Sequence, residues 1–237
     1  MGLDVYVGPL TRYYSGDWEN VAERAQRTRS ARPRSMAGRA GAGSQDLERA
    51  RLAVLAWRSA LSASLGASTS VTAPLDWEES DTAPYYTGRP GWNGFGSLVL
   101  WAAYAEHPAL RVPATLPEEW DNDPALVRSN AESFRSRYSH LVRNVELWLP
   151  VAFEITFEGE GVDRRRIVVG SSATLACQLA ALNAATWKAQ PAEVVTWARR
   201  EPDGEAALEL RARYAFALMA DLAAKAVDQR LPMKLDF

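Results

Sequence analysis

The chain has 237 residues, of which 47% are hydrophobic and 24% are charged, and its formal net charge is −2. That length and apolar content suffice for one sizeable core, so we expect a single globular domain over residues 1–237. A nearly neutral chain has no overall field to attract nucleic acid or an anionic membrane, and we expect neither partner.

Redox and targeting features predict a cytoplasmic protein. Cys177 is the only cysteine, which excludes an intramolecular disulfide and suits a reducing compartment. The N-terminus lacks a basic segment followed by an apolar stretch, as a secretory leader would have. Residues 167–187 carry no charge, but polar residues interrupt them, so we do not expect a membrane span.

The first elements in chain order are a short strand and a helix. Residues 3–7 are followed by Gly8-Pro9 and predict a strand that stops at a turn. Asp17 is the expected N-cap of a helix that runs to about Gln26. Residues 24–44 hold six arginines and no acidic residue, and they predict a flexible connection, with 27–43 the most mobile internal segment.

A clear amphipathic helix is predicted over residues 44–65, where apolar side chains recur at helical spacing. Residues 67–96 are rich in Pro, Gly and aromatic residues without an apolar period, which predicts a long ordered loop of the kind that often carries function. A buried helix over 95–105 follows. Asp123-Pro124 then predicts an N-cap and first position of a helix running toward Tyr138.

The last third combines a hairpin with three helices. Apolar and polar residues alternate between 151 and 169 around a turn at 159–163, which predicts a β-hairpin. Helices are expected from Ser171 or Ser172, over 191–200 and over 205–229. The last one has a buried stripe formed by Leu208, Ala212, Ala215, Met219, Leu222 and Ala226.

These elements predict an α+β fold. We expect a mostly helical single domain with a small antiparallel or mixed sheet, made from the N-terminal strand and the hairpin near 151–169. Helices are expected to pack on one face of that sheet.

Two short strings recur and occur together both times. Tyr-Tyr-Ser-Gly at 13–16 precedes Asp-Trp-Glu at 17–19, and Asp-Trp-Glu-Glu at 76–79 precedes Tyr-Tyr-Thr-Gly at 85–88. Aromatic faces beside carboxylates suit sugars or cations, so we predict one shared concave surface; the alternative is that the rings only anchor long loops. The candidate binding residues are Arg12, Tyr13, Tyr14, Asp17, Trp18, Asp76, Trp77, Glu78, Tyr85, Tyr86, Arg89 and Trp92.

The sequence gives little support for a metal site, a cofactor site or a catalytic nucleophile. The two histidines, His107 and His140, cannot form a histidine-rich metal site, and His140 is expected at the surface. Cys177 lies in an apolar helical run, where a thiol is usually a small core residue. We therefore expect no metal site and no cofactor.

The opening Gly2-Leu3-Asp4-Val5-Tyr6-Val7-Gly8, followed by Leu10-Thr11-Arg12-Tyr13-Tyr14, resembles the start of a bacterial sequence type to which no activity is attached. The resemblance covers a short stretch. It implies a soluble bacterial protein and transfers no catalytic residue.

These observations predict a non-catalytic binding or interaction protein, for instance an immunity-type or accessory protein. Its acidic and aromatic surface would bind a protein partner or a small polar, sugar-like ligand. The alternative is a hydrolase or transferase that uses two carboxylates on a carbohydrate-like ligand. Its acidic groups would come from Asp17, Glu19, Asp76, Glu78, Glu79, Glu118 and Glu119.

Overall fold

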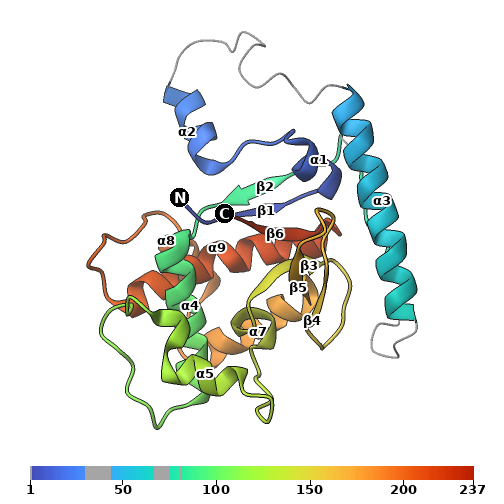
Figure 1. The fold of residues 1–237 in the computed structure, drawn as a ribbon. Helices are drawn as coiled ribbons and strands as arrows, with labels where there is room; N and C mark the ends of the chain where they lie inside the picture. The colour runs from blue at the N-terminus through green and yellow to red at the C-terminus, as the bar shows by residue number, and fades with distance from the viewer. Residues whose placement is uncertain (1, 30–43, 67–74, 81) are drawn as a thin grey trace.

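A computed structural model describes residues 2–29, 44–66, 75–80 and 82–237 (Figure 1). In this part of the chain one mixed sheet has the strand order β2-β1-β6-β3-β5-β4, with helices around it, which confirms the predicted α+β class. The strands are β1 (Asp4–Val7), β2 (Tyr86–Gly88), β3 (Val145–Leu149), β4 (Phe157–Glu160), β5 (Arg166–Ser171) and β6 (Met233–Asp236). The helices are α1 (Leu10–Ser15), α2 (Val21–Arg29), α3 (Ser44–Gly66), α4 (Gly91–Glu106), α5 (Pro124–Asn130), α6 (Ser139–Val142), α7 (Ser172–Ala185), α8 (Pro191–Trp197) and α9 (Leu208–Asp228), with a 3-10 turn η1 (Trp120–Asn122).

The centre of the sheet is β6, a strand that the sequence did not predict. It runs antiparallel to β1 on one side, where Val5 pairs with Leu235, and antiparallel to β3 on the other, where Trp148 pairs with Met233. β3 and β5 are parallel, and β4 completes the expected hairpin with β5 at the sheet edge. The sheet therefore contains strands from both ends of the described chain.

One face of the sheet packs on a helical layer of α4, α7 and α9 (Figure 1). Val5, Leu98, Trp148 and Leu179 are fully or almost fully buried in this core. The predicted stripe of the last helix is confirmed, because all six of its residues are buried. On its outer side Arg213 bonds Glu209 and Lys225 bonds Asp221, as the i,i+4 spacing favours.

The other face is also covered, which corrects the expectation of helices on one face alone. α1 and α3 lie on this side together with the chain around Leu75 and Trp77 (Figure 1). A second core, containing Val54, Leu147 and Ile167, fills the space between them and the sheet. The apolar face of α3 that the sequence spacing predicted packs in this second core, and the limits of the helix agree with the prediction.

The segment after α1 differs from its prediction. α2 begins at Val21, and its first turn is closed by Asn20 and Glu23, whose side chains each accept a hydrogen bond from the other's backbone N–H. Asp17 is therefore not the N-cap. Residues 24–29 are helical rather than part of a flexible connection, while residues 30–43, which hold most of the predicted mobile segment, lie outside the described residues.

The predicted long loop at 67–96 is shorter than expected. Residues 86–88 form β2, and α4 begins at Gly91, whose positive φ of 65° suits a glycine. Residues 67–74 and 81 lie outside the described part. Of the described residues before β2, Glu79 and Ala83 bond α1.

The remaining differences concern element boundaries and one thiol. Asp123 caps α5 as predicted, by accepting from the Ala125 N–H at 2.8 Å, but that helix ends at Asn130. The first hairpin strand starts at Phe157 and not near 151. Cys177 is exposed on α7 and not in the core. Among the described residues no helix has both the length and the apolarity needed to span a membrane.

His140 is fully buried, which corrects the expectation of a surface group. Its Nδ1 accepts a hydrogen bond from the Ser171 N–H at 2.8 Å, so the ring proton is on Nε2, 3.1 Å from the Glu154 carbonyl that accepts it. Burial lowers the pKa of His140 below its ordinary value. Protonation would also place a second donor against the Ser171 N–H.

We expect the free energy of unfolding to fall as the pH drops below about 6.5, the ordinary histidine pKa. A depressed pKa means that the unfolded chain binds a proton that folded His140 does not, so this stability is complete above the unfolded pKa and is lost toward the folded pKa. The limiting slope for one proton is about 1.4 kcal/mol per pH unit. Urea unfolding at several pH values measures this slope.

The Met219→Asp variant should be destabilised by roughly 3 kcal/mol or more, because it places an unpaired charge at a fully buried position of α9. Leu210→Asp is the matched control on the same helix, since Leu210 is 54% exposed. Thermal and urea unfolding of both variants compare the two sites. Equal melting temperatures would contradict the burial of this stripe.

Candidate functional site

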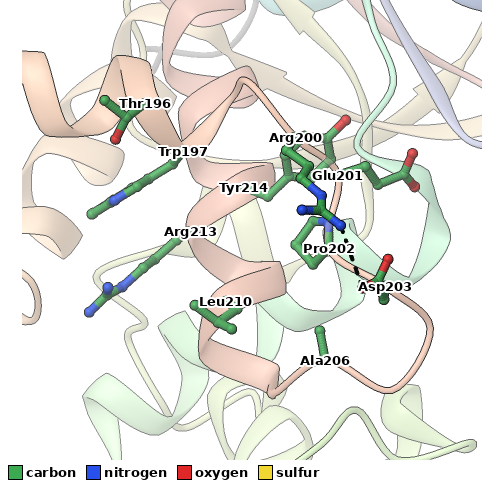
Figure 2. Close-up of a pocket in the computed structure, with 10 residues that line it drawn as sticks. All are labelled: Thr196, Trp197, Arg200, Glu201, Pro202, Asp203, Ala206, Leu210, Arg213 and Tyr214. Carbon is green, nitrogen blue, oxygen red and sulfur yellow. Dashed lines mark ion pairs between the residues drawn. The ribbon is translucent and has the colours of Figure 1, made fainter.

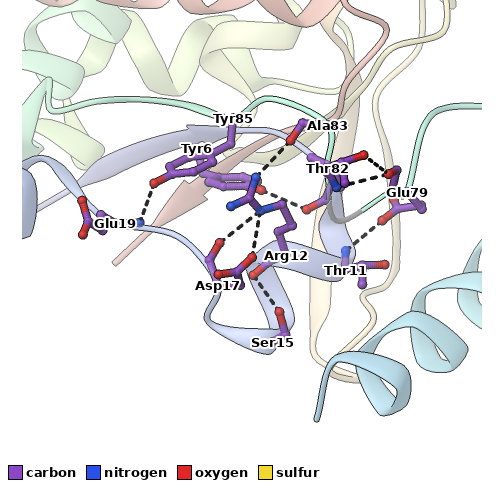
Figure 3. A network of polar contacts seen from close by, with 12 residues as sticks. Tyr6, Thr11, Arg12, Ser15, Asp17, Glu19, Glu79, Thr82, Ala83 and Tyr85 are labelled. Atoms are coloured by element: carbon purple, nitrogen blue, oxygen red, sulfur yellow. Dashed lines mark hydrogen bonds and ion pairs between the residues drawn. The ribbon is translucent and has the colours of Figure 1, made fainter. Parts of the chain in front are cut away.

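Several of the predicted site residues lie close together around α1 (Figure 3). This helix lies over β1 and β6 of the sheet. The N-terminus of α1 is closed by Glu79, whose carboxylate accepts from the backbone N–H of Leu10 at 3.3 Å and of Thr11 at 2.8 Å. The Trp77 indole N–H donates to the same carboxylate. A negative group at a helix N-terminus is favourable, so this contact fixes the chain around residue 79 to α1.

Arg12 connects α1 with both neighbouring segments (Figure 3). It forms an ion pair with Asp17 at 3.2 Å and donates to the carbonyl oxygens of Asp17 and Ala83. Its guanidinium lies 4.6 Å from the centre of the Tyr85 ring. Arg12 thus pairs with one of the candidate carboxylates, and the Asp17 side chain remains 44% exposed.

Four predicted rings form one cluster, with Tyr6 of β1 at its centre. Tyr6 lies 5.0 Å from Trp18, 5.4 Å from Tyr13 and 6.0 Å from Tyr85, measured between ring centroids. Tyr14 packs edge-on against Tyr13 at 5.1 Å. Offset and edge contacts of this kind stabilise the cluster beyond its buried area. The sequence pattern marks Tyr6 only as part of the N-terminal strand and gives no signal that it belongs to the ring cluster.

The hydroxyl groups of Tyr6 and Tyr13 are neutral hydrogen-bond donors. Burial raises the pKa of Tyr6, Tyr13 and Tyr14 well above the usual range. Tyr13 donates to the Asp236 carboxylate at 2.8 Å, and Tyr6 donates to the Pro9 carbonyl at 3.0 Å. The rings thus pack on one another and on the sheet.

A buried ammonium lies beneath the Tyr13 ring. Lys234 of β6 is 2% exposed, its Nζ is 5.3 Å from the Tyr13 ring centre, and burial lowers its pKa. Glu146, Asp163 and Asp236 oppose that shift. The β3–β5 register shifts at Glu146, and the Glu146 Oε2 is buried without a hydrogen-bond partner among the described residues. A register shift of this kind is a β-bulge, which changes the direction of a side chain locally.

Three predicted rings lie elsewhere, which corrects the single aromatic surface. Trp77 is buried in the second core, 6.3 Å from Trp57. Tyr86 faces the helical layer, where Lys225 of α9 lies 5.1 Å from its ring. Trp92 packs at 5.2 Å against Phe237.

The other polar candidates are also separated from the ring cluster. Arg89 pairs with Asp4 at 2.7 Å and not with a carboxylate of the repeated strings. Asp76 is exposed, and its carbonyl accepts from Arg230 at 3.1 Å. Glu78 is exposed and accepts from the Ser80 N–H at 3.2 Å.

A cavity of about 330 Å³ lies beside the cluster, between α1, α3 and residues 77–80. Thr11 lines it, and the Thr11 Oγ1 is buried and has no hydrogen-bond partner among the described residues. Arg58 lies 5.2 Å from the Trp77 ring centre and donates to the Trp77 carbonyl at 2.9 Å. The rest of the lining is Leu47, Arg51, Leu55, Glu78, Glu79 and Ser80.

A second cavity, of about 360 Å³, lies between α8 and α9 (Figure 2). Arg213 lies 5.2 Å from the Trp197 ring centre and bonds Glu209, while Arg200 and Asp203 approach to 3.9 Å with both side chains almost fully exposed. Exposed pairs of that length contribute little. Within the described residues no cluster of three His, Cys, Asp or Glu side chains could hold a metal ion.

Comparison of this chain with family models, with curated proteins and with solved structures finds no match. Its function is therefore argued from its own residues.

The Glu79→Gln variant should be destabilised by about 1–3 kcal/mol, because the amide replaces a charged acceptor of three N–H groups and turns one acceptor into a donor. Glu78→Gln is the matched control, since Glu78 is exposed, and it should change stability by less than about 0.5 kcal/mol. Urea unfolding followed by circular dichroism measures both. Equal losses would show that Glu79 does not secure α1.

Proposed function

We propose that this protein acts by binding and that its ligand is a small, polar, sugar-like molecule held between α1, α3 and residues 77–80. The observation that carries the proposal is Thr11, which lines this cavity and whose buried hydroxyl has no hydrogen-bond partner within the described part of the chain. A buried hydroxyl left unpaired is costly, and a ligand that bonds it would remove that cost.

The contacts of the carboxylates favour binding over two-carboxylate catalysis. Glu79 already accepts three N–H groups, and Asp17 is paired with Arg12. Glu118 and Glu119 adjoin η1, whose Trp120 packs into the core on the α4 side of the sheet. A glycosidase pair needs two available carboxyls facing each other about 5–9.5 Å apart. Glu79 and Asp17 are already engaged in other contacts and are therefore poorly placed to supply such a pair.

The lining also indicates the kind of ligand. Arg51 and Arg58 balance Glu78 and Glu79 in charge, so the cavity offers donors and acceptors without a net attraction for an ion. Its volume of about 330 Å³ is near the lower end for small-molecule sites. A neutral, polyhydroxylated molecule fits this balance best.

The Thr11→Val variant separates binding from folding. Removing an unpaired buried hydroxyl without changing the shape should leave stability unchanged or raise it by about 1 kcal/mol. The same change should weaken binding of a neutral sugar about tenfold, because the ligand loses its hydrogen bond. Thr11→Ser keeps the hydroxyl and should keep most of the affinity.

Saturation-transfer NMR with glucose, galactose and N-acetylglucosamine, against sodium phosphate, is the measurement, with thermal unfolding in parallel. Binding of phosphate alone would contradict a neutral ligand. Unchanged sugar affinity in Thr11→Val would remove the hydroxyl from the site.

A further inference from the structure

Within the described part of the chain, no strand pairs with the outer edge of β4. β4 is the outermost strand next to β5, and the hairpin is closed by the Gly161 N–H, which donates to the Arg165 carbonyl at 2.8 Å. In the antiparallel register that follows, Phe157 and Gly159 bond β5, while the backbone groups of Glu158 and Glu160 point outward. The Trp57 indole donates to the Glu160 carbonyl at 2.6 Å, which agrees with that direction.

Cavities flank this edge on both faces of the sheet. On the α3 side a cavity of about 730 Å³ is lined mostly by apolar groups, among them Trp57, Leu61 and Phe157, and also by Glu158, Glu160 and Arg164. On the opposite side a more polar cavity of about 420 Å³ is lined by Arg143, Asn144 and Glu158, among others. A strand added to an edge sends successive side chains to opposite faces, so both cavities would receive them.

The charges on β4 favour a partner protein over a second copy of this chain. Phe157 packs in the core on the α3 side, so the side chains of Glu158 and Glu160 lie on the other face. Antiparallel pairing of two β4 strands would place glutamates opposite glutamates, which is destabilising. Glu158 has an exposed ion pair with Arg166, a weak contact that a stronger one can replace.

We propose that β4 is a docking edge for an extended segment of a partner protein, in which apolar residues alternate with basic ones. The apolar residues enter the cavity beside α3, and the basic residues lie opposite Glu158 and Glu160. The backbone N–H and C=O of Glu158 supply the pairing hydrogen bonds. This surface is separate from the sugar-like ligand site at Thr11 and does not depend on it.

The probe is a fluorescein-labelled peptide Val-Lys-Val-Lys-Val-Lys with blocked ends. Two peptides of matched length serve as controls, Val-Val-Val-Lys-Lys-Lys, which loses the alternation, and Val-Glu-Val-Glu-Val-Glu, which reverses the charge. Fluorescence anisotropy should show both controls binding at least about tenfold more weakly than the probe. Amide exchange followed by NMR should show new protection at Glu158 and Glu160 with the probe.

Two pairs of variants test the geometry. Glu158→Pro removes the outward N–H, which β5 does not use, and should abolish probe binding while Glu158→Ala keeps most of it. Ala60→Phe fills the cavity beside α3 and should also block the probe. Ala63→Phe, at an exposed position of the same helix outside that cavity, should not.

If Glu158→Pro fails to fold, the comparison of Ala60→Phe with Ala63→Phe still tests the proposal. Equal binding of all three peptides, or no protection at Glu158 with the probe bound, would overturn the proposal. A concentration-dependent dimer in analytical ultracentrifugation, with protection at Glu158 before any peptide is added, would overturn it in favour of a second copy.

Discussion

The rest of the structure depends on the insertion of β6 between β1 and β3. Without this strand, β1 would pair with β2 alone, and β3, β5 and β4 would form a separate three-stranded sheet. The side chains of Met233 and Leu235 belong to the core on the side of α4, α7 and α9, so this core continues across β6. The side chain of Lys234 points to the opposite face, which α1 covers. Because α1 follows β1 directly, the position of the ring cluster and of its neighbouring cavity is set by the same junction.

The two faces of the sheet are used differently. The face toward α4, α7 and α9 is apolar over β1, β6 and β3, whereas the other face is apolar over β3, β5 and Phe157 of β4. Over β1 and β6 it carries Tyr6, Lys234 and Asp236, covered by Tyr13. Burying an ammonium is costly, and the nearby carboxylates and the aromatic ring offset part of that cost. Residues so committed to one another are poor ligand contacts, which is why the adjacent cavity is the better site.

The sequence predicted the long elements well because each has a repeating apolar face. α3 and α9 were found from their stripes, and the side chain of Ser171 caps α7 as expected by accepting from the Thr174 N–H. β2 and β6 were missed since three or four residues are too short to show a period. Their pairing depends on contacts made far along the chain.

The ring contacts that the sequence anticipated are the local ones, such as those of Tyr13 with Tyr14 and Trp18. The pairing of Arg12 with Asp17, five residues apart, is also local, although the sequence did not predict it. The cap of α1 comes from Glu79, 69 residues away from Leu10, a distance at which no spacing rule applies. Tyr85 and Tyr86 were grouped, although successive side chains of an extended segment point to opposite faces.

The junction at β6 also determines the order in which the fold can be completed. Val5 pairs with Leu235, 230 residues later in the chain, and closing so large a loop costs more entropy than forming any local hairpin or helix pair. The β3, β5 and β4 portion has shorter connections and can form first. During synthesis, β1 and β3 must wait with unpaired edges until β6 emerges, and these edges are where the nascent chain is most open to misassembly with its neighbours.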